Sequence, residues 1–144
     1  MSNATIHASC VAIGRRGVLI AGRSGAGKSD LALRLIDRGA VLVSDDYSLV
    51  EAIEGALQAS PPETIAGKIE VRGVGVVETV HQPAVTVALL IDLDFVPERL
   101  PGPGLRDICG ISIPVIGLNG LEPSAPIKVE AALSLHGLAP PCPP

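Results

Sequence analysis

Short apolar runs alternate with polar, glycine-containing turns along this chain, a pattern that predicts several short strands and few helices. Apolar runs at residues 6–13, 18–21 and 41–43 predict three strands in the first third of the chain. Residues 29–38, between the second and third runs, carry apolar side chains at helical spacing. Gly39 follows them and suits the end of a helix, so we expect strand, loop, helix and strand in succession.

Beyond residue 44 the pattern becomes richer in strands. It predicts, in order, a hairpin 49–53/56–59, strands 69–72, 85–93 and 111–116, and a helix 127–138. Phe95 to Asp107 contains three prolines and two glycines, so we expect a mobile loop there. We expect one domain over residues 1–139, a disordered tail at 140–144, and an α/β fold with a mixed, β-rich sheet.

Composition narrows the class of protein. The 144 residues are 47% hydrophobic but include one Tyr, one Phe and no Trp, so the core must consist of Val, Ile, Leu and Ala. The net charge of -4 provides no overall field that would attract nucleic acid. No apolar run is long enough to span a bilayer, and the three cysteines lack metal-ligand spacing. We therefore expect a cytoplasmic protein that binds neither nucleic acid nor membrane.

A phosphate-binding motif lies between the second predicted strand and the first predicted helix. It reads Gly22-Arg23-Ser24-Gly25-Ala26-Gly27-Lys28-Ser29 and fits the Walker A pattern in full. Its glycines let backbone N–H groups converge on phosphate oxygens, and the helix N-terminus adds positive potential. Lys28 is placed to reach the phosphates, and Ser29 offers a hydroxyl to Mg²⁺. The motif predicts a P-loop core that binds a nucleotide.

Carboxylates follow the next strand. Asp45 and Asp46 end it, where they could hold Mg²⁺ or activate a nucleophile, or form a solvated turn. Asp30 could complement the helix dipole or lie near the metal. Arg72 lies two residues from Glu70, which allows either an ion pair or a phosphate contact.

A second nucleotide-binding pattern is present downstream. Asp107-Ile-Cys-Gly110 fits the Asp-x-x-Gly pattern of GTPases, but the chain has no Asn-Lys-x-Asp base-reading motif. We interpret this match as chance.

Two segments resemble one family. The run from Gly22 to Asp46 resembles the P-loop-to-Asp-Asp segment of HPr kinase/phosphorylase, and Ile69 to Val77 resembles that family's second signature. His7 matches the histidine before the family's P-loop. The resemblance implies an enzyme that phosphorylates a serine of the phosphocarrier HPr with ATP or pyrophosphate. It also implies the phosphorolysis of phosphoseryl-HPr, in which phosphate is the attacking group and pyrophosphate is a product. Members of the family form hexamers, so the resemblance further implies a homo-oligomer.

The resemblance also implies residue roles. Lys28 grips the phosphates, while Ser29 and Glu70 bind Mg²⁺. Asp46 accepts the serine proton and returns it in the reverse reaction, and Asp45 belongs to the same metal and proton network.

Two further residues match by motif. His7 matches a residue near the phosphates, and Arg99, in Glu98-Arg99-Leu100, resembles an arginine of the family's Asp-Arg-Leu loop.

The chain also departs from the family pattern. The family's arginine-rich segment is replaced by residues 120–126, which contain no basic residue, so phosphorolysis is a secondary expectation. Asp30 stands where the family has Glu. We expect the chain to lack the N-terminal domain of longer members. It resembles the short α-proteobacterial forms, which implies a regulatory phosphotransfer system.

Two other functions compete with this hypothesis. A small-molecule kinase of the P-loop group would need several lid arginines, and residues 95–107 offer only Arg99 and Arg106. A nucleotide-binding regulatory module would have lost catalysis. Against such a loss stands the joint presence of five candidate site residues, Lys28, Ser29, Asp45, Asp46 and Glu70.

Overall fold

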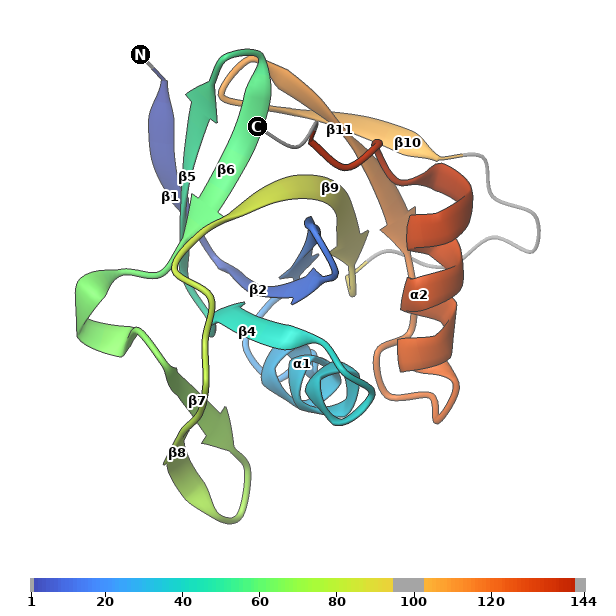
Figure 1. The fold of residues 1–144 in the computed structure, drawn as a ribbon. Helices are drawn as coiled ribbons and strands as arrows, with labels where there is room; N and C mark the ends of the chain where they lie inside the picture. The colour runs from blue at the N-terminus through green and yellow to red at the C-terminus, as the bar shows by residue number, and fades with distance from the viewer. Residues whose placement is uncertain (1, 95–102, 142–144) are drawn as a thin grey trace.

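The structure, a computed structural model, describes residues 2–94 and 103–141. Within these ranges it contains a nine-stranded sheet, a separate two-stranded hairpin and two α-helices (Figure 1). The elements are, in chain order, β1 Asn3–Ile6, β2 Ala8–Ile13, β3 Arg16–Ala21, α1 Lys28–Asp37, β4 Val41–Ser44, β5 Ser48–Ile53, β6 Ala56–Ser60, the 3-10 turn η1 Glu63–Ile65, β7 Lys68–Val71, β8 Gly75–Glu78, β9 Val85–Asp92, β10 Gly104–Ile108, β11 Ile111–Gly117 and α2 Ala125–His136.

The sheet is mixed, as the sequence predicts. Its strand order is β1-β5-β6-β9-β3-β2-β4, with β11 also paired to β9 and β10 paired to β11. The β3–β9 and β9–β11 pairs are parallel, and the other pairs are antiparallel. The predicted β-rich α/β fold class is therefore confirmed. Strand β3 lies inside the sheet, so the loop that follows Ala21 leaves from the carboxyl end of a central strand, where α/β folds bind ligands.

The run at residues 6–13 is two strands rather than one. β1 pairs with β5, whereas β2 pairs with β3 and β4, and the chain bends at His7 between them. The apolar pattern continues across the bend and conceals it. The bend matters because it places the His7 side chain near the end of β4.

The prediction of a loop from Phe95 to Asp107 is wrong over its last four residues. Gly104–Ile108 form β10, an edge strand paired antiparallel with β11. The first four residues of β10 are exposed, so no buried face imposes an apolar alternation that the sequence could reveal. Strand β8, which the sequence did not predict, is exposed throughout and lacks an apolar alternation for the same reason. Residues 95–102, with Arg99, lie outside the described residues, as do residues 142–144.

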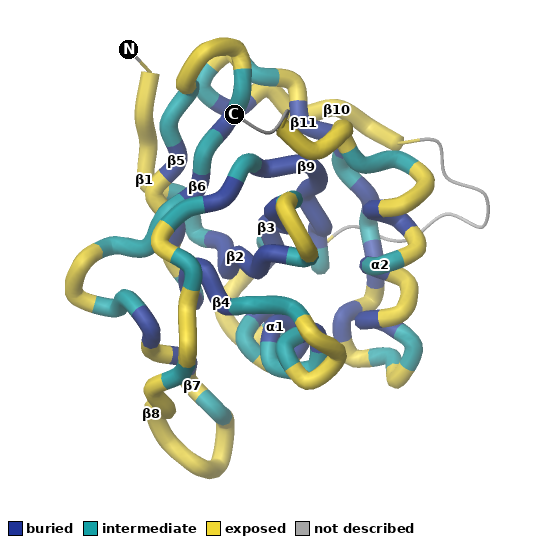
Figure 2. The backbone as a smooth tube through the Cα atoms, in the orientation of Figure 1, coloured by how far each residue is buried: buried dark blue, intermediate teal, exposed yellow. Residues whose placement is uncertain are grey.

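The core occupies both faces of the sheet. Along β3, Val18 and Ile20 pack in the cluster beneath the helices, and Leu19 packs in the cluster on the opposite face. Successive side chains of a strand point to opposite faces, so a continuous apolar run indicates a strand covered on both sides. Figure 2 shows this burial concentrated in β2, β3 and β9. The apolar core thereby holds the end of β3 in place for the site.

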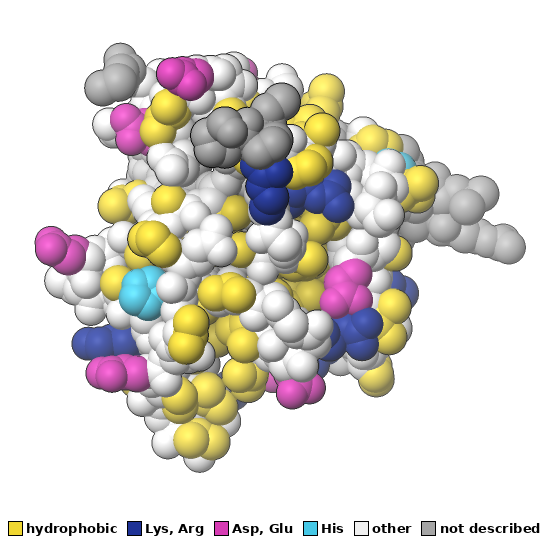
Figure 3. Space-filling model, viewed as in Figure 1, with side chains coloured by type: hydrophobic (Ala, Val, Ile, Leu, Met, Phe, Trp, Pro, Cys, Tyr) yellow, Lys and Arg dark blue, Asp and Glu magenta, His cyan; other side chains and the backbone are white. Residues whose placement is uncertain are grey.

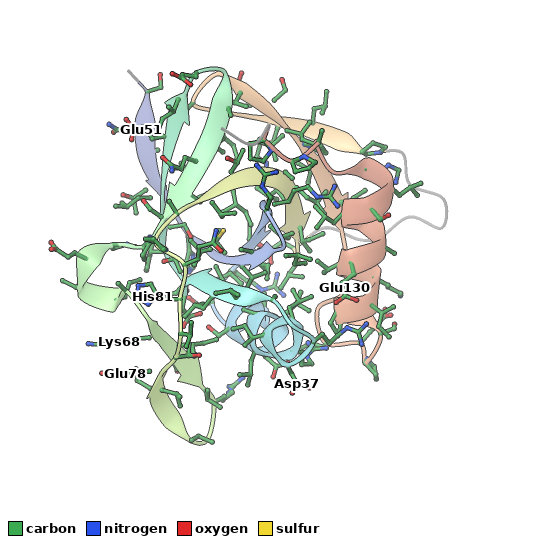
Figure 4. The ribbon with its side chains drawn as sticks, viewed as in Figure 1. Asp37, Glu51, Lys68, Glu78, His81 and Glu130 are labelled. Carbon is green, nitrogen blue, oxygen red and sulfur yellow. The ribbon has the colours of Figure 1, made fainter. Side chains whose placement is uncertain are left out.

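Arginines tie the two helices together. Arg38, the residue directly after α1, donates to Glu130 of α2 through contacts of 2.7 to 3.1 Å, and this hydrogen bonding raises the pKa of the guanidinium; Glu130 is labelled in Figure 4. Arg34 donates to the carbonyl of Glu122 at 2.9 Å. The arginines of this region are thus held by partners rather than presented as one basic surface. Among the described residues, neither helix is both long and apolar enough to cross a membrane.

Candidate active site

The loop between β3 and α1 folds around the Lys28 side chain. Gly25 and Gly27 adopt φ values of 85° and 99°, which side chains other than glycine rarely tolerate. The Lys28 ammonium donates to the carbonyls of Gly22 at 2.8 Å and Arg23 at 3.1 Å, and its side chain is only 4% exposed. The loop therefore encloses a buried positive charge at the N-terminus of α1, an arrangement suited to phosphate.

Asp45 connects three segments of the site. It lies just past β4, is buried, and accepts hydrogen bonds from the hydroxyls of Ser9 at 3.1 Å and Ser29 at 2.6 Å. Its other oxygen accepts the backbone N–H of Glu70 at 2.9 Å. One carboxylate thus fixes the start of α1, the strand β2 and the hairpin β7–β8 relative to one another.

Asp46 is oriented toward the loop by its backbone and by two neighbours. Its φ of 68° is left-handed, a region that Asp tolerates better than most residues, and its N–H donates to Ser9 at 2.9 Å. His7 Nε2 lies 2.8 Å from Asp46 Oδ1, and the His7 ring stacks on Tyr47 at 4.9 Å. The Lys28 ammonium lies 3.7 Å from the same oxygen. The Asp46 side chain is 50% exposed, so its carboxylate is held in place and still open to an incoming hydroxyl.

Glu70 reaches the site from the separate hairpin. Its neighbour Ile69 is buried in the core beside α1 and anchors β7 there. Glu70 and Val71 then line the same space as Lys28 and Ser29. The hairpin accordingly supplies a wall of the site, although only its inner residues join the core.

These residues surround a cavity of about 380 Å³. The P-loop and the first turn of α1 form one wall, and the end of β7 forms another. Its lining residues are Ser24, Gly25, Gly27, Lys28, Ser29, Asp30, Leu33, Asp46, Glu70, Val71 and Arg72. The cavity combines buried positive charge with carboxylates, a combination that suits a phosphate chain and a divalent cation.

The oxygen donors of the site suit Mg²⁺. Ser29 offers a hydroxyl, Glu70 a carboxylate at the cavity wall, and Asp45 a carboxylate bonded to Ser29. In the part of the chain that the structure describes, no group of three or more His, Cys, Asp or Glu side chains forms a complete metal cage. Mg²⁺ typically takes one or two protein carboxylates and completes its shell with water and substrate phosphates. The donor set therefore fits a metal that arrives with a nucleotide.

The structure brings together six of the candidate residues that the sequence predicts for the site: His7, Lys28, Ser29, Asp45, Asp46 and Glu70. Asp30 pairs with Arg34 at 3.0 Å, one turn further along α1. Asp107 accepts the N–H of Gly110 at 2.9 Å in the turn after β10, so the GTPase-like pattern forms a turn there.

Sequence reasoning missed two positions of the site. Ser9 is fully buried and bonds both Asp45 and Asp46, and the signal for it was a hydroxyl within an apolar strand. Asp94 accepts the backbone N–H of Arg23 at 3.0 Å and so supports the loop from outside, without a sequence signal.

Comparisons with known proteins identify relatives of this chain. The family model described as HPr Serine kinase C-terminal domain matches residues 1–85. The HPr kinase/phosphorylase of Clostridium tetani is 45% identical over 73 residues, which cover 51% of this chain and 24% of that protein. The HPr kinase/phosphorylase of a Thermoanaerobacter species is 48% identical over 75 residues, or 51% and 25%. The chain thus aligns with about a quarter of the length of these curated relatives.

A solved structure is similar over nearly the whole chain. It is the Hpr(Ser) kinase/phosphatase from Coxiella burnetii, with a TM-score of 0.81 and 30% sequence identity. The likeness covers 92% of this chain and 95% of that one. This coverage is larger than that of the family model, which matches residues 1–85.

Proposed function

Because the chain belongs to the HPr serine kinase C-terminal domain family, we propose that it is a kinase that phosphorylates a serine of an HPr-type phosphocarrier protein with ATP and Mg²⁺. The observation that carries this proposal is the juxtaposition of Asp46 with Lys28. The ammonium of Lys28 lies 3.7 Å from Oδ1 of Asp46, whose side chain is half exposed. A phosphate donor and a proton acceptor can therefore serve the same reacting centre.

In the proposed reaction, Asp46 is the general base. A serine hydroxyl is a poor nucleophile at neutral pH, and transfer of its proton to Asp46 assists formation of the new bond to phosphorus. The bond between the γ-phosphorus and the oxygen that bridges to the β-phosphate breaks, and ADP leaves. His7, at 2.8 Å from Asp46, orients the carboxylate.

Lys28 and the backbone N–H groups of the loop offset the negative charge of the phosphates. Ser29 and Glu70 would hold Mg²⁺, with Asp45 positioning Ser29, and the bound metal supplies further neutralisation of phosphate charge.

The proposal includes the reverse use of the same site. Inorganic phosphate attacks the phosphorus of phosphoserine, the bond from phosphorus to the serine oxygen breaks, and protonated Asp46 returns its proton to that oxygen. The products are serine and pyrophosphate. The names of the relatives, kinase/phosphorylase and kinase/phosphatase, support activity in both directions.

The proposal also includes a homo-oligomer in the cytoplasm, a hexamer by family resemblance. Exposed apolar side chains support assembly, since monomeric proteins rarely expose several together. Figure 3 shows hydrophobic side chains gathered over β7–β8, where Val74 and Val76 are 77% and 67% exposed. Leu135 of α2 is 78% exposed. Light scattering on the purified chain measures the assembly directly.

Transfer of label to HPr tests the function. The protein is incubated with ATP labelled at the γ-phosphate, Mg²⁺ and purified HPr, and the expected product is HPr that carries acid-stable phosphoserine. A Lys28→Ala variant is the matched negative control. Absence of transfer to HPr or to a paralogue would overturn the proposal. The alternative of a small-molecule kinase would need lid arginines that contact its substrate. Arg106, one of the two candidate lid arginines, instead binds Asp92 at 2.9 Å, so this alternative has little support.

A further inference from the structure

Arg72 differs from the other arginines that the structure describes. Six guanidinium groups donate to a carboxylate or a backbone carbonyl: Arg15 to Pro141, Arg16 to Leu133, Arg23 to Asp94, Arg34 to Asp30, Arg38 to Glu130 and Arg106 to Asp92. The Arg72 guanidinium forms no ion pair with any residue in ranges 2–94 and 103–141. The ion pair with Glu70 that the sequence allowed is therefore not formed.

The backbone of Arg72 is well anchored although its side chain is exposed. Ile69, three residues earlier, is buried in the core, and the N–H of Glu70 is held by Asp45 at 2.9 Å. Gly73, with a φ of 83°, begins the turn of the hairpin directly after Arg72. The anchor on one side and the turn on the other place Arg72 at the wall of the cavity that Lys28 also lines.

The lining of this cavity carries more carboxylates than cationic side chains. Its lining includes two cationic side chains, Lys28 and Arg72, and three carboxylates, Asp30, Asp46 and Glu70. Lys28 already contacts Asp46 at 3.7 Å, so a phosphate chain gains additional stabilisation from a second positive side chain. The planar guanidinium matches phosphate oxygens with two parallel hydrogen bonds, which an ammonium cannot do.

We propose that Arg72 is a phosphate-binding residue of this cavity and contacts the phosphate chain of the nucleotide or pyrophosphate opposite the P-loop. The assignment rests on the proposed function, because the ligand of Arg72 is the same phosphate-containing ligand that the proposed function places in this cavity. It adds a cation on the hairpin to those of the loop. The hairpin thereby acts in phosphate binding as well as through Glu70.

Calorimetric titration with pyrophosphate and with ADP tests the assignment without any transfer step. The variants are Arg72→Gln and Arg72→Lys, with Lys68→Gln as matched control. Lys68 lies on the same hairpin, its substitution removes the same charge, and Figure 4 shows its side chain pointing away from α1 and the cavity. Far-UV circular dichroism before titration establishes that each variant is folded.

Arg72→Gln should weaken both ligands about tenfold or more, as expected for loss of a hydrogen-bonded charge pair. Arg72→Lys should recover part of the affinity, and Lys68→Gln should bind as the unaltered protein does. Equal affinity in Arg72→Gln and Lys68→Gln would overturn the assignment, even if HPr is phosphorylated. Conversely, an Arg72-dependent affinity in a protein that fails to phosphorylate HPr would support the assignment and overturn the proposed function.

Discussion

Asp45 should be the most costly single carboxylate to remove, because it is a structural hub as well as a part of the site. Its buried side chain accepts hydrogen bonds from Ser9, Ser29 and the backbone N–H of Glu70. A hydrogen bond to a charged group contributes about 1.5 to 3 kcal/mol, and neighbouring bonds are not additive. Asp45→Ala removes all three bonds, which lowers the free energy of unfolding, but it also removes the cost of burying a charge. We therefore expect a net loss of about 3 kcal/mol in the free energy of unfolding. For a chain of this size, that lowers Tm by roughly 10 °C.

Urea unfolding followed by far-UV circular dichroism measures this loss, since the chain has no Trp. Asp45→Asn should cost less, because an amide can donate to the hydroxyls and keep its oxygen for Glu70. Asp37→Ala is the matched control: Asp37 lies exposed in the last turn of α1 (Figure 4), and its loss should change stability by less than about 0.5 kcal/mol. If Asp45→Ala unfolds at the same urea concentration as Asp37→Ala, the three bonds do not hold the site together.

Three further predictions concern the core. Leu35→Ala, at a fully buried position of α1, should lower the free energy of unfolding by about 2 to 5 kcal/mol, and a loss below about 1 kcal/mol in urea unfolding would contradict the packing. Gly17→Ala should cost roughly 1 to 3 kcal/mol by the same assay, because its Cβ would lie 2.6 Å from Cγ1 of Val85; an unchanged midpoint would mean that β3 and β9 are further apart. Burial raises the pKa of the Cys10 thiol, so iodoacetamide should label the half-buried Cys109 in the native protein and spare Cys10; equal labelling by mass spectrometry would contradict this burial.

The parts of the fold that could be predicted are those set by local pattern. The strand, loop and helix around Lys28 follow from an apolar run, a glycine-rich motif and a helical stripe that are contiguous in sequence. Asp45 and Asp46 could be placed near the P-loop because ligand sites of α/β sheets lie at the carboxyl ends of strands. In the structure β3 and β4 run in the same direction on either side of β2, so their carboxyl ends share one edge of the sheet. Exposed edge strands such as β10 lack this kind of signal.

The parts that could not be predicted depend on contacts between distant segments. His7 and Asp46 are 39 residues apart, and only the family resemblance connected them before the structure did. The choice between an ion pair and a phosphate contact at Arg72 depends on side-chain direction next to the hairpin turn, which spacing alone leaves open. The role of Ser9 could not be predicted for the same reason, because its partners Asp45 and Asp46 lie in the distant turn after β4.

The central claim is that Asp46 accepts the proton of a serine whose oxygen attacks a phosphate held by the P-loop. Asp46→Asn keeps the size of the side chain and removes its basicity, so the most direct measurement compares this variant with the unaltered protein in two assays. The first is the intact mass of HPr after incubation with ATP and Mg²⁺, and the second is calorimetric titration with ADP. We expect Asp46→Asn to bind ADP within a few-fold of the unaltered protein and to add no phosphoryl group to HPr. Phosphoserine formed at an undiminished rate by Asp46→Asn would contradict the account.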